Sequence, residues 1–370
     1  MAGRLHDQAN SPNGAPRPLE QTLSVVIPVF HCGDALSKLV AEIREVADRN
    51  ELAPGVVVRL DEIVLVCDNP DLAASERARL LDLEARDQRV RVLWLTRNFG
   101  QHPATVAGIV STSGDWVTTM DEDGQHDPAQ LAAMLRVAAR HGTPLVYAKP
   151  TNPPPHSAFR NFASRTAKAL FLSISGARSE FHSFRMIEGT VARSACAYMG
   201  ESVYLDVAIR WSCGDAELCP MRMRDEGSKS AYNYRRLLGH LKRMVLSSGA
   251  RPLRVIAAFG VLVGIGGIGL AAFVVDRRLT GAYASTPGWA SEIVTLLLLF
   301  AVLFITLAAL AEYLSFAAGN SIGKPLYVVA DPADVRALWK LQAALAEADL
   351  EAARVAEIPP RRAAVRRRRA

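Results

Sequence analysis

Alternation of buried strands with amphipathic helices is the feature that most constrains this 370-residue chain. Leu23–Phe30 is a continuous apolar run typical of a buried strand, and Asp34–Asn50 spaces its apolar residues with a helical period. The pattern then repeats, with strands predicted at Glu62–Asp68, Val90–Thr96, Trp116–Asp121 and Pro144–Ala148 and helices at Ala74–Arg86, Gln101–Ser111 and Pro128–Arg140. This alternation predicts an α/β fold, in which a mostly parallel sheet carries helices on both faces.

Acidic residues gather at one of the predicted strand ends. Asp121, Glu122 and Asp123 follow the strand Trp116–Asp121 directly, and Asp68 ends an earlier strand. The carboxyl ends of parallel strands meet at one edge of the sheet, where α/β proteins bind ligands. Crowded carboxylates repel one another unless a hard divalent cation shares them, so the cluster predicts a Mg²⁺ or Mn²⁺ site. A solvated acidic turn is the alternative.

Two long apolar runs in the last third of the chain predict a membrane anchor. Val255–Val275 and Ile293–Leu310 each approach the roughly 20 residues that cross a bilayer as a helix. The sequence therefore predicts a transmembrane hairpin over 253–318, with spans at about 253–275 and 293–314. Basic residues are more frequent outside the hairpin than in its loop. By the positive-inside rule, the protein is expected to be multi-pass with both termini in the cytosol.

The remaining segments are predicted from composition. Residues 1–22 are rich in Pro, Asn and Gly and are expected to form a disordered leader before a catalytic domain at 23–230. A basic amphipathic helix is predicted at 231–252, and residues 319–370 are expected to form a tail with a helix and a polybasic end. The charge distribution favours anionic lipid over nucleic acid, and the five cysteines are expected to stay reduced.

Several motifs resemble the family 2 glycosyltransferases with the GT-A fold, which is Rossmann-like. The strongest are Ser24–Phe30, Arg97–Gln101 and Met120–Gln125. Further motifs follow in the same order at Ser183–Met186, Arg224–Tyr232, Arg251–Leu253, Glu312–Leu314 and Lys324–Tyr327. The ordered set spans about residues 23–330. It resembles the membrane-bound polyprenyl-phosphate glycosyltransferases, a group similar to dolichol-phosphate mannose synthase and the bacterial polyprenyl-phosphate glucosyltransferases.

The resemblance implies an inverting enzyme of the inner (cytoplasmic) membrane. It would move a sugar from a nucleotide-sugar donor to polyprenyl phosphate on the cytosolic face, and it would act as a homo-oligomer in the lipid bilayer. A phosphate monoester has a second pKa near 6, so this acceptor needs no general base. The alternatives are a diverged, weakly active membrane scaffold that keeps the fold, or a transferase that acts on another lipid acceptor.

The resemblance also implies roles for individual residues. Residues expected at the nucleotide, its ribose or its diphosphate are Pro28, Val29, Phe30, Asp68, Asn98, Asp121 and Asp123. Asp121 and Asp123 would hold the metal, and Gln125 would face the sugar or the acceptor. Residues expected to steer the acceptor phosphate are Arg160, Arg185, Arg224 and Lys229. A helix cap is the alternative for Asp68, and a surface salt bridge is the alternative for Arg185 and Arg224.

The chain departs from the family pattern at several positions. His31-Cys32 replaces the usual Asn-Glu, Cys67 replaces an acid or Asn, Ser183 replaces an acid, and Asn69–Asp71 replaces a Gly-Ser turn. These changes are expected to lie mainly in the nucleotide pocket. They indicate an unusual donor or reduced activity.

Overall fold

The computed structural model describes residues 19–48, 51–53, 56–152, 182–200, 203–224, 288–321 and 323–356, with short stretches between 258 and 280. Several predicted features lie outside these residues. They are the leader up to residue 18, the amphipathic helix at 231–252, the polybasic end, and the side chains of Arg160 and Lys229.

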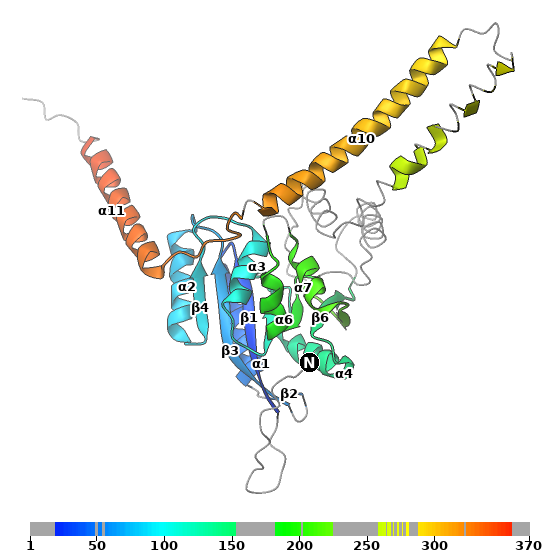
Figure 1. Ribbon diagram of the computed structural model, residues 1–370. Helices are drawn as coiled ribbons and strands as arrows, with labels where there is room; N and C mark the ends of the chain where they lie inside the picture. Colours follow the sequence, from blue (N-terminus) through cyan, green and yellow to red (C-terminus); the bar gives the residue numbers. More distant parts are fainter. Residues whose placement is uncertain are drawn as a thin grey trace, which may run out of the picture.

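Strands of the described chain form one mixed sheet of eight, in the order β2-β3-β1-β5-β7-β6-β8 with β4 paired to β3 (Figure 1). Their bounds are β1 Leu19–Val29, β2 Glu51–Ala53, β3 Val56–Cys67, β4 Val90–Trp94, β5 Trp116–Thr119, β6 Leu145–Pro150, β7 Arg185–Glu188 and β8 Glu217–Met221. Parallel pairing joins β4, β3, β1 and β5, which confirms the predicted parallel sheet. The short strand β7 enters between β5 and β6 and runs antiparallel to both.

Strand β1 begins at Leu19, inside the segment that composition assigns to a disordered leader. Leu19 to Thr22 pair in parallel with Val56 to Arg59 of β3. Thr22 also donates from its backbone N–H and its hydroxyl to the carboxylate of Asp115, each at 2.9 Å. Backbone pairing therefore extends the strand through polar residues that carry no apolar signal.

Helices cover both faces of the sheet, as the alternation predicts (Figure 1). On one face lie α1 Asp34–Asp48, α2 Ala74–Arg86 and α4 Leu131–His141, the last preceded by a 3₁₀ turn at Pro128–Gln130. On the other face lie α3 Gln101–Val110, α6 Gly189–Cys196 and α7 Leu205–Cys213. Side chains of neighbouring residues in one strand point to opposite faces of the sheet: Val26 packs under α3, whereas Ile27 packs under α1.

One described helix is long and apolar enough to cross a membrane. Helix α10 spans Trp289–Ser321, and its apolar segment is Leu299–Gly319, near the span predicted at 293–314. At 1.5 Å per residue, its 33 residues extend about 50 Å, which exceeds a hydrocarbon core of about 30 Å. The first predicted span is described only in pieces, with a shorter apolar helix over Ala258–Gly267.

The chain that leaves α10 returns to the sheet and covers its outer edge. Ala330 donates its N–H to the Trp94 carbonyl at 2.8 Å, and Thr96 donates to Val328 at 3.0 Å. The next helix, α11 (Pro332–Ala356), places Trp339 edge-on to Trp94 with ring centroids 4.8 Å apart. The exposed backbone groups of β4 are thus paired by the chain itself, which blocks pairing with another molecule.

Candidate active site

The candidate site lies where the parallel strands β1, β3, β4 and β5 end. Hydrogen bonds fix the register of these ends: Asp68 donates its N–H to Val29 at 2.8 Å, and Met120 donates to Val26 at 3.0 Å. This register brings Asp68 and Asp121 to the same edge of the sheet as the loop after β1, although the three are far apart in sequence.

Asp121 is held by side chains from two other segments. Gln101, the first residue of α3, donates its amide to Oδ1 at 2.6 Å, and the Ser183 hydroxyl donates to Oδ2 at 2.6 Å. Burial raises the pKa of Asp121, although both hydrogen bonds act to lower it. The Ser183 departure from the family therefore has a structural role, because a hydroxyl stabilises the carboxylate that a second acid would repel.

Glu122 fastens the loop after β1, a role that the sequence did not assign. Its carboxylate accepts the backbone N–H of Phe30 at 2.8 Å and that of His31 at 3.1 Å. Burial, together with the nearby charges of Asp123 and Asp121, raises the pKa of Glu122 to about 7, although these two hydrogen bonds act to lower it. Its place inside the acidic cluster is the only sequence signal for this residue.

The carboxylates of Asp121 and Asp123 fit a divalent cation by their chemistry. The pKa of Glu122 is raised mainly by burial and in smaller part by the charges of Asp123 and Asp121, and a shared cation would relieve that repulsion. Within the described residues, no group of three or more His, Cys, Asp or Glu side chains forms a complete cation site. Asp121 and Asp123 would supply two oxygen donors, and diphosphate oxygens and water would supply the others.

Two histidines beside the site belong to its structure. His126 is 3% exposed and accepts the backbone N–H of Asp121 at its Nδ1, at 3.0 Å. His182 accepts the N–H of Phe184 at 3.1 Å. Burial lowers the pKa of each imidazole to about 4, so both are neutral at physiological pH. His126 thereby holds the turn after Asp121, and His182 holds the residues just before β7.

Asp68 has the capping role that the sequence offered as its alternative. It is 4% exposed, and its two carboxylate oxygens accept the N–H groups of Phe99 and Gly100, each at 2.7 Å. The carboxylate thereby fixes the turn that leads into α3. Of its neighbours at the expected nucleotide site, Phe30 is 42% exposed, whereas Val29 is fully buried in the core.

Cys32 and Cys67, which depart from the family pattern, lie in the hydrophobic core. Both are at most 1% exposed, and burial raises the pKa of the Cys32 thiol to about 11 and that of Cys67 to about 12. The expectation that these two departures alter the nucleotide pocket is therefore wrong. His31, by contrast, is exposed at the end of β1.

Arg185 lies in the core, 3% exposed. Its guanidinium donates to the Asp206 carboxylate through Nη1 and to the Thr119 hydroxyl through Nε at 3.0 Å. The hydroxyl of Tyr147 donates to the same carboxylate at 2.8 Å. Strand β7 carries Arg185 into the sheet between β5 and β6. The residue therefore fits neither the predicted contact with the acceptor phosphate nor the alternative, a surface salt bridge.

Arg224 is partly exposed and paired with two carboxylates. Its Nη1 lies 2.5 Å from Glu42 of α1, and its Nη2 lies 2.7 Å from Asp127. Its backbone N–H also donates to the carbonyl of Gln125 at 3.0 Å. Arg224 thus joins β8 to the turn after the acidic cluster and places Gln125, whose N–H donates to Asp123 at 3.1 Å.

Comparison with known proteins finds similar sequences among sugar transferases. Residues 24–199 match the family model described as Glycosyl transferase family 2. Two relatives are undecaprenyl-phosphate 4-deoxy-4-formamido-L-arabinose transferases. The protein from Klebsiella pneumoniae is 28% identical over 324 residues, which are 84% of this chain and 94% of the relative. The protein from Edwardsiella ictaluri is 29% identical over 322 residues, which are 84% and 93%.

Among solved structures, the chain resembles mannosyl-3-phosphoglycerate synthase from Rubrobacter xylanophilus, with a TM-score of 0.44 and 19% identity. That match covers 63% of this chain and 74% of the other.

Proposed function

Because residues 24–199 match the family model Glycosyl transferase family 2, we propose that the chain transfers a sugar from a nucleotide-sugar donor to polyprenyl phosphate at the cytosolic face of a membrane. The relatives from Klebsiella and Edwardsiella are named for transfer to undecaprenyl phosphate, and the chain covers more than nine-tenths of each. These relatives support a polyprenyl phosphate as the acceptor.

One observation carries the proposal: the chain that follows the apolar helix α10 reaches the edge of the sheet where β4 ends and borders a pocket there. Lys324 and Leu326, which follow α10, border the same pocket as Phe99, which precedes α3, and His102, which lies in α3. Gln101, the first residue of α3, holds Asp121. A lipid-borne acceptor can therefore reach the site while its chain stays in the membrane.

The acceptor explains why the site needs no general base. A phosphate monoester already carries negative charge at neutral pH, so its oxygen can attack the anomeric carbon directly, and a single displacement inverts that carbon. A divalent cation held by Asp121 and Asp123 would neutralise the departing nucleotide diphosphate. Gln101 and Ser183 keep the Asp121 carboxylate in place, and Glu122 holds the loop that carries Phe30.

The alternative of a weakly active scaffold loses part of its support. It rested on departures assigned to the nucleotide pocket, and two of them, Cys32 and Cys67, lie in the core. The Ser183 change supports Asp121 directly.

A donor screen tests the function. Membranes that contain the protein, Mg²⁺ or Mn²⁺, and polyprenyl phosphate are incubated with a panel of nucleotide sugars, and the lipid extract is analysed by mass. We expect a lipid-linked sugar from at least one donor, and a loss of at least about 100-fold in Asp123→Ala. Asp82→Ala, which removes an exposed carboxylate of α2, is the matched control. Absence of product with every donor would overturn the function, and normal product from Asp123→Ala would overturn the cation site alone.

We also propose the predicted topology and a homo-oligomer, which the family resemblance supports. Single cysteines introduced at 284 and 365 would be labelled by a membrane-impermeant maleimide from opposite sides of the membrane. Labelling of both from outside would contradict cytosolic termini. Cross-linking in intact membranes tests the oligomer, and a product that stays monomeric would contradict it.

A further inference from the structure

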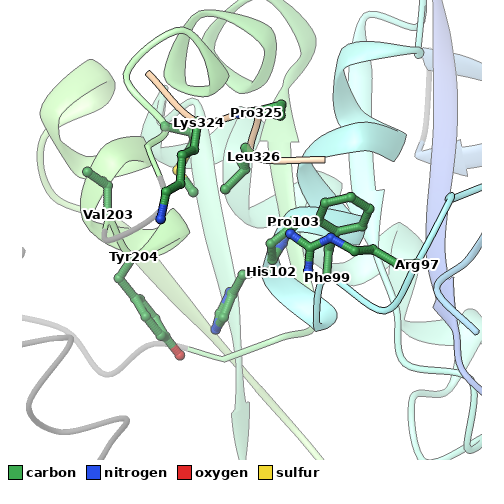
Figure 2. Close-up of a pocket in the computed structure, with 10 residues that line it drawn as sticks. Arg97, Phe99, His102, Pro103, Val203, Tyr204, Lys324, Pro325 and Leu326 are labelled. Atoms are coloured by element: carbon green, nitrogen blue, oxygen red, sulfur yellow. The ribbon is translucent and has the colours of Figure 1, made fainter. Parts of the chain in front are cut away.

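The described part of the chain contains a pocket of about 190 Å³ beside the candidate site (Figure 2). Three segments that are distant in sequence form it. They are the loop after β4 with the start of α3, the connection from α6 to α7, and the chain that leaves α10.

The side chains around this pocket suit an anion that is attached to an apolar group. Among the residues that the structure describes, its lining includes Arg97, His102 and Lys324 and no carboxylate. In Figure 2, Lys324 extends toward Tyr204 and His102, whose rings lie 4.2 Å apart. The guanidinium of Arg97 lies 4.0 Å over the ring of Phe99, which holds it beside the pocket. Cationic donors at several angles match the oxygens of a phosphate group.

The position of the pocket links the membrane helix to the acidic site. Lys324 follows the end of α10 at Ser321 by three residues, so it lies near the depth of lipid headgroups when α10 spans the bilayer. On the opposite side, His102 adjoins Gln101, whose amide donates to Asp121 at 2.6 Å. A phosphate in this pocket would thus lie between the bilayer and the carboxylates.

We propose that this pocket binds the phosphate headgroup of a membrane lipid, and that the polyprenyl phosphate acceptor supplies it. The inference rests on the proposed function. It gives Arg97, His102 and Lys324 the acceptor-holding role that the sequence gave to Arg185 and Arg224. Those two guanidinium groups are engaged by Asp206 in one case and by Glu42 and Asp127 in the other.

Direct binding without any sugar donor tests the pocket. The full chain is placed in nanodiscs of zwitterionic lipid, and its affinity for a short-chain prenyl phosphate is measured by calorimetry. Arg97→Gln and Lys324→Gln should each weaken binding about tenfold, because each removes a charge-assisted hydrogen bond. Arg336→Gln, which removes an exposed charge from α11, should leave the affinity unchanged. The conservative changes Arg97→Lys and Lys324→Arg should retain most of the binding, which separates charge from folding.

A second arm separates the two sources of phosphate. The titrations are repeated in nanodiscs that contain phosphatidylglycerol, an abundant phosphate-bearing lipid. An unchanged affinity for prenyl phosphate supports the acceptor as the ligand. If phosphatidylglycerol weakens the binding of prenyl phosphate to the parent chain, and this competition disappears in Lys324→Gln, the pocket belongs to bulk anionic lipid. That result would overturn the acceptor assignment.

The outcomes also separate this inference from the proposed function. Unchanged binding of prenyl phosphate in both Gln variants, with unfolding temperatures like the parent, would overturn the pocket even if sugar transfer is normal. If prenyl phosphate binds and the Gln variants weaken this binding, but the chain transfers no sugar from any donor, the proposed function is overturned and the assignment of the pocket stands.

Discussion

Arg185 shows how a residue with a functional appearance in sequence becomes part of the core. Strand β7 carries it into the sheet, where it is 3% exposed and paired with Asp206, which is also 3% exposed. Removal of one partner from a buried pair leaves an uncompensated charge, whereas replacement of both by apolar groups does not.

We therefore expect Arg185→Leu to lower the free energy of unfolding by about 3–5 kcal/mol. Urea titration of the detergent-solubilised protein, followed by near-UV circular dichroism, measures it. The double variant Arg185→Leu/Asp206→Leu should recover much of the loss. Arg210→Leu is the control, since its partner Asp215 is half exposed and such pairs contribute at most about 1 kcal/mol. A loss in Arg185→Leu no larger than in the control would contradict the buried-pair assignment.

Glu62 gives the stability a dependence on pH. Burial raises the pKa of Glu62, but the Ser113 N–H at 2.7 Å, the Arg91 guanidinium at 2.8 Å and the Ser24 hydroxyl outweigh it, so the pKa is lowered from 4.5. A carboxyl whose folded pKa lies below its unfolded pKa stabilises the fold above the unfolded value. That contribution disappears as the pH falls through the folded pKa.

At pH 6 the parent chain should therefore have a larger free energy of unfolding than Glu62→Gln, with the whole contribution of the ionised carboxylate present. This difference should become progressively smaller as the pH falls below about 4.5. Thermal unfolding from pH 6 to pH 3 measures it. Asp82→Asn, which alters an exposed helical pair, should show little change over the same range. A constant difference for Glu62→Gln would contradict the lowered pKa.

At the scale of elements, α3 connects the acidic site to the proposed lipid pocket. Its first residue holds Asp121, its second borders the pocket, and the turn before it is fixed by Asp68. Gly108 allows the helix to approach the sheet closely, because an added Cβ would lie 2.3 Å from a Val26 methyl and 3.0 Å from a Val66 methyl.

We expect Gly108→Ala to destabilise the protein by about 1–3 kcal/mol and to lower sugar transfer, since a shift of α3 displaces Gln101. Unfolding temperature and transfer rate check the two effects. Gly33→Ala is the control, because a Cβ there meets nothing within 4 Å. Equal behaviour of the two variants would mean that α3 can move without cost to the site.

At the scale of the whole molecule, the C-terminal segment connects the long apolar helix α10 to the edge of the sheet. Backbone hydrogen bonds pair it with β4, and Trp339 packs on Trp94 while Arg77 lies 4.8 Å over the Trp339 ring. Val335 and Trp339 are α11 residues that pack against the core, and Trp339 provides the ring contacts with Trp94 and Arg77.

Trp339→Ala should release α11, because it removes the ring contacts, which contribute about 1 kcal/mol beyond the buried area. Limited proteolysis should then cut within 332–356 faster than in the parent chain. Leu341→Ala changes a residue that is 57% exposed and should leave the cleavage rate unchanged. Equal cleavage of the two variants would contradict the docking role.

Local pattern was enough to predict the parallel core of the fold. Apolar runs and helical periods gave β1, β3, β4 and β5 with their helices, because each of these elements buries a continuous apolar face. The short strand β7 and the polar start of β1 were missed. Their pairing is decided by partners that lie more than thirty residues away, and no local period encodes it.

The sequence by itself determined the α/β fold, the ordered motifs that match the glycosyl transferase family 2 model over residues 24–199, and the acidic group at the end of β5, since these follow from periodicity and from residue order. Only the tertiary structure decided which partners each charged side chain meets. Carboxylates of other elements bind Arg185 and Arg224, while Arg97 and Lys324, which are far apart in sequence, line the same pocket. The physical reason is that a charge becomes structural or functional through the burial and the partners that folding brings to it, and both depend on contacts between distant segments.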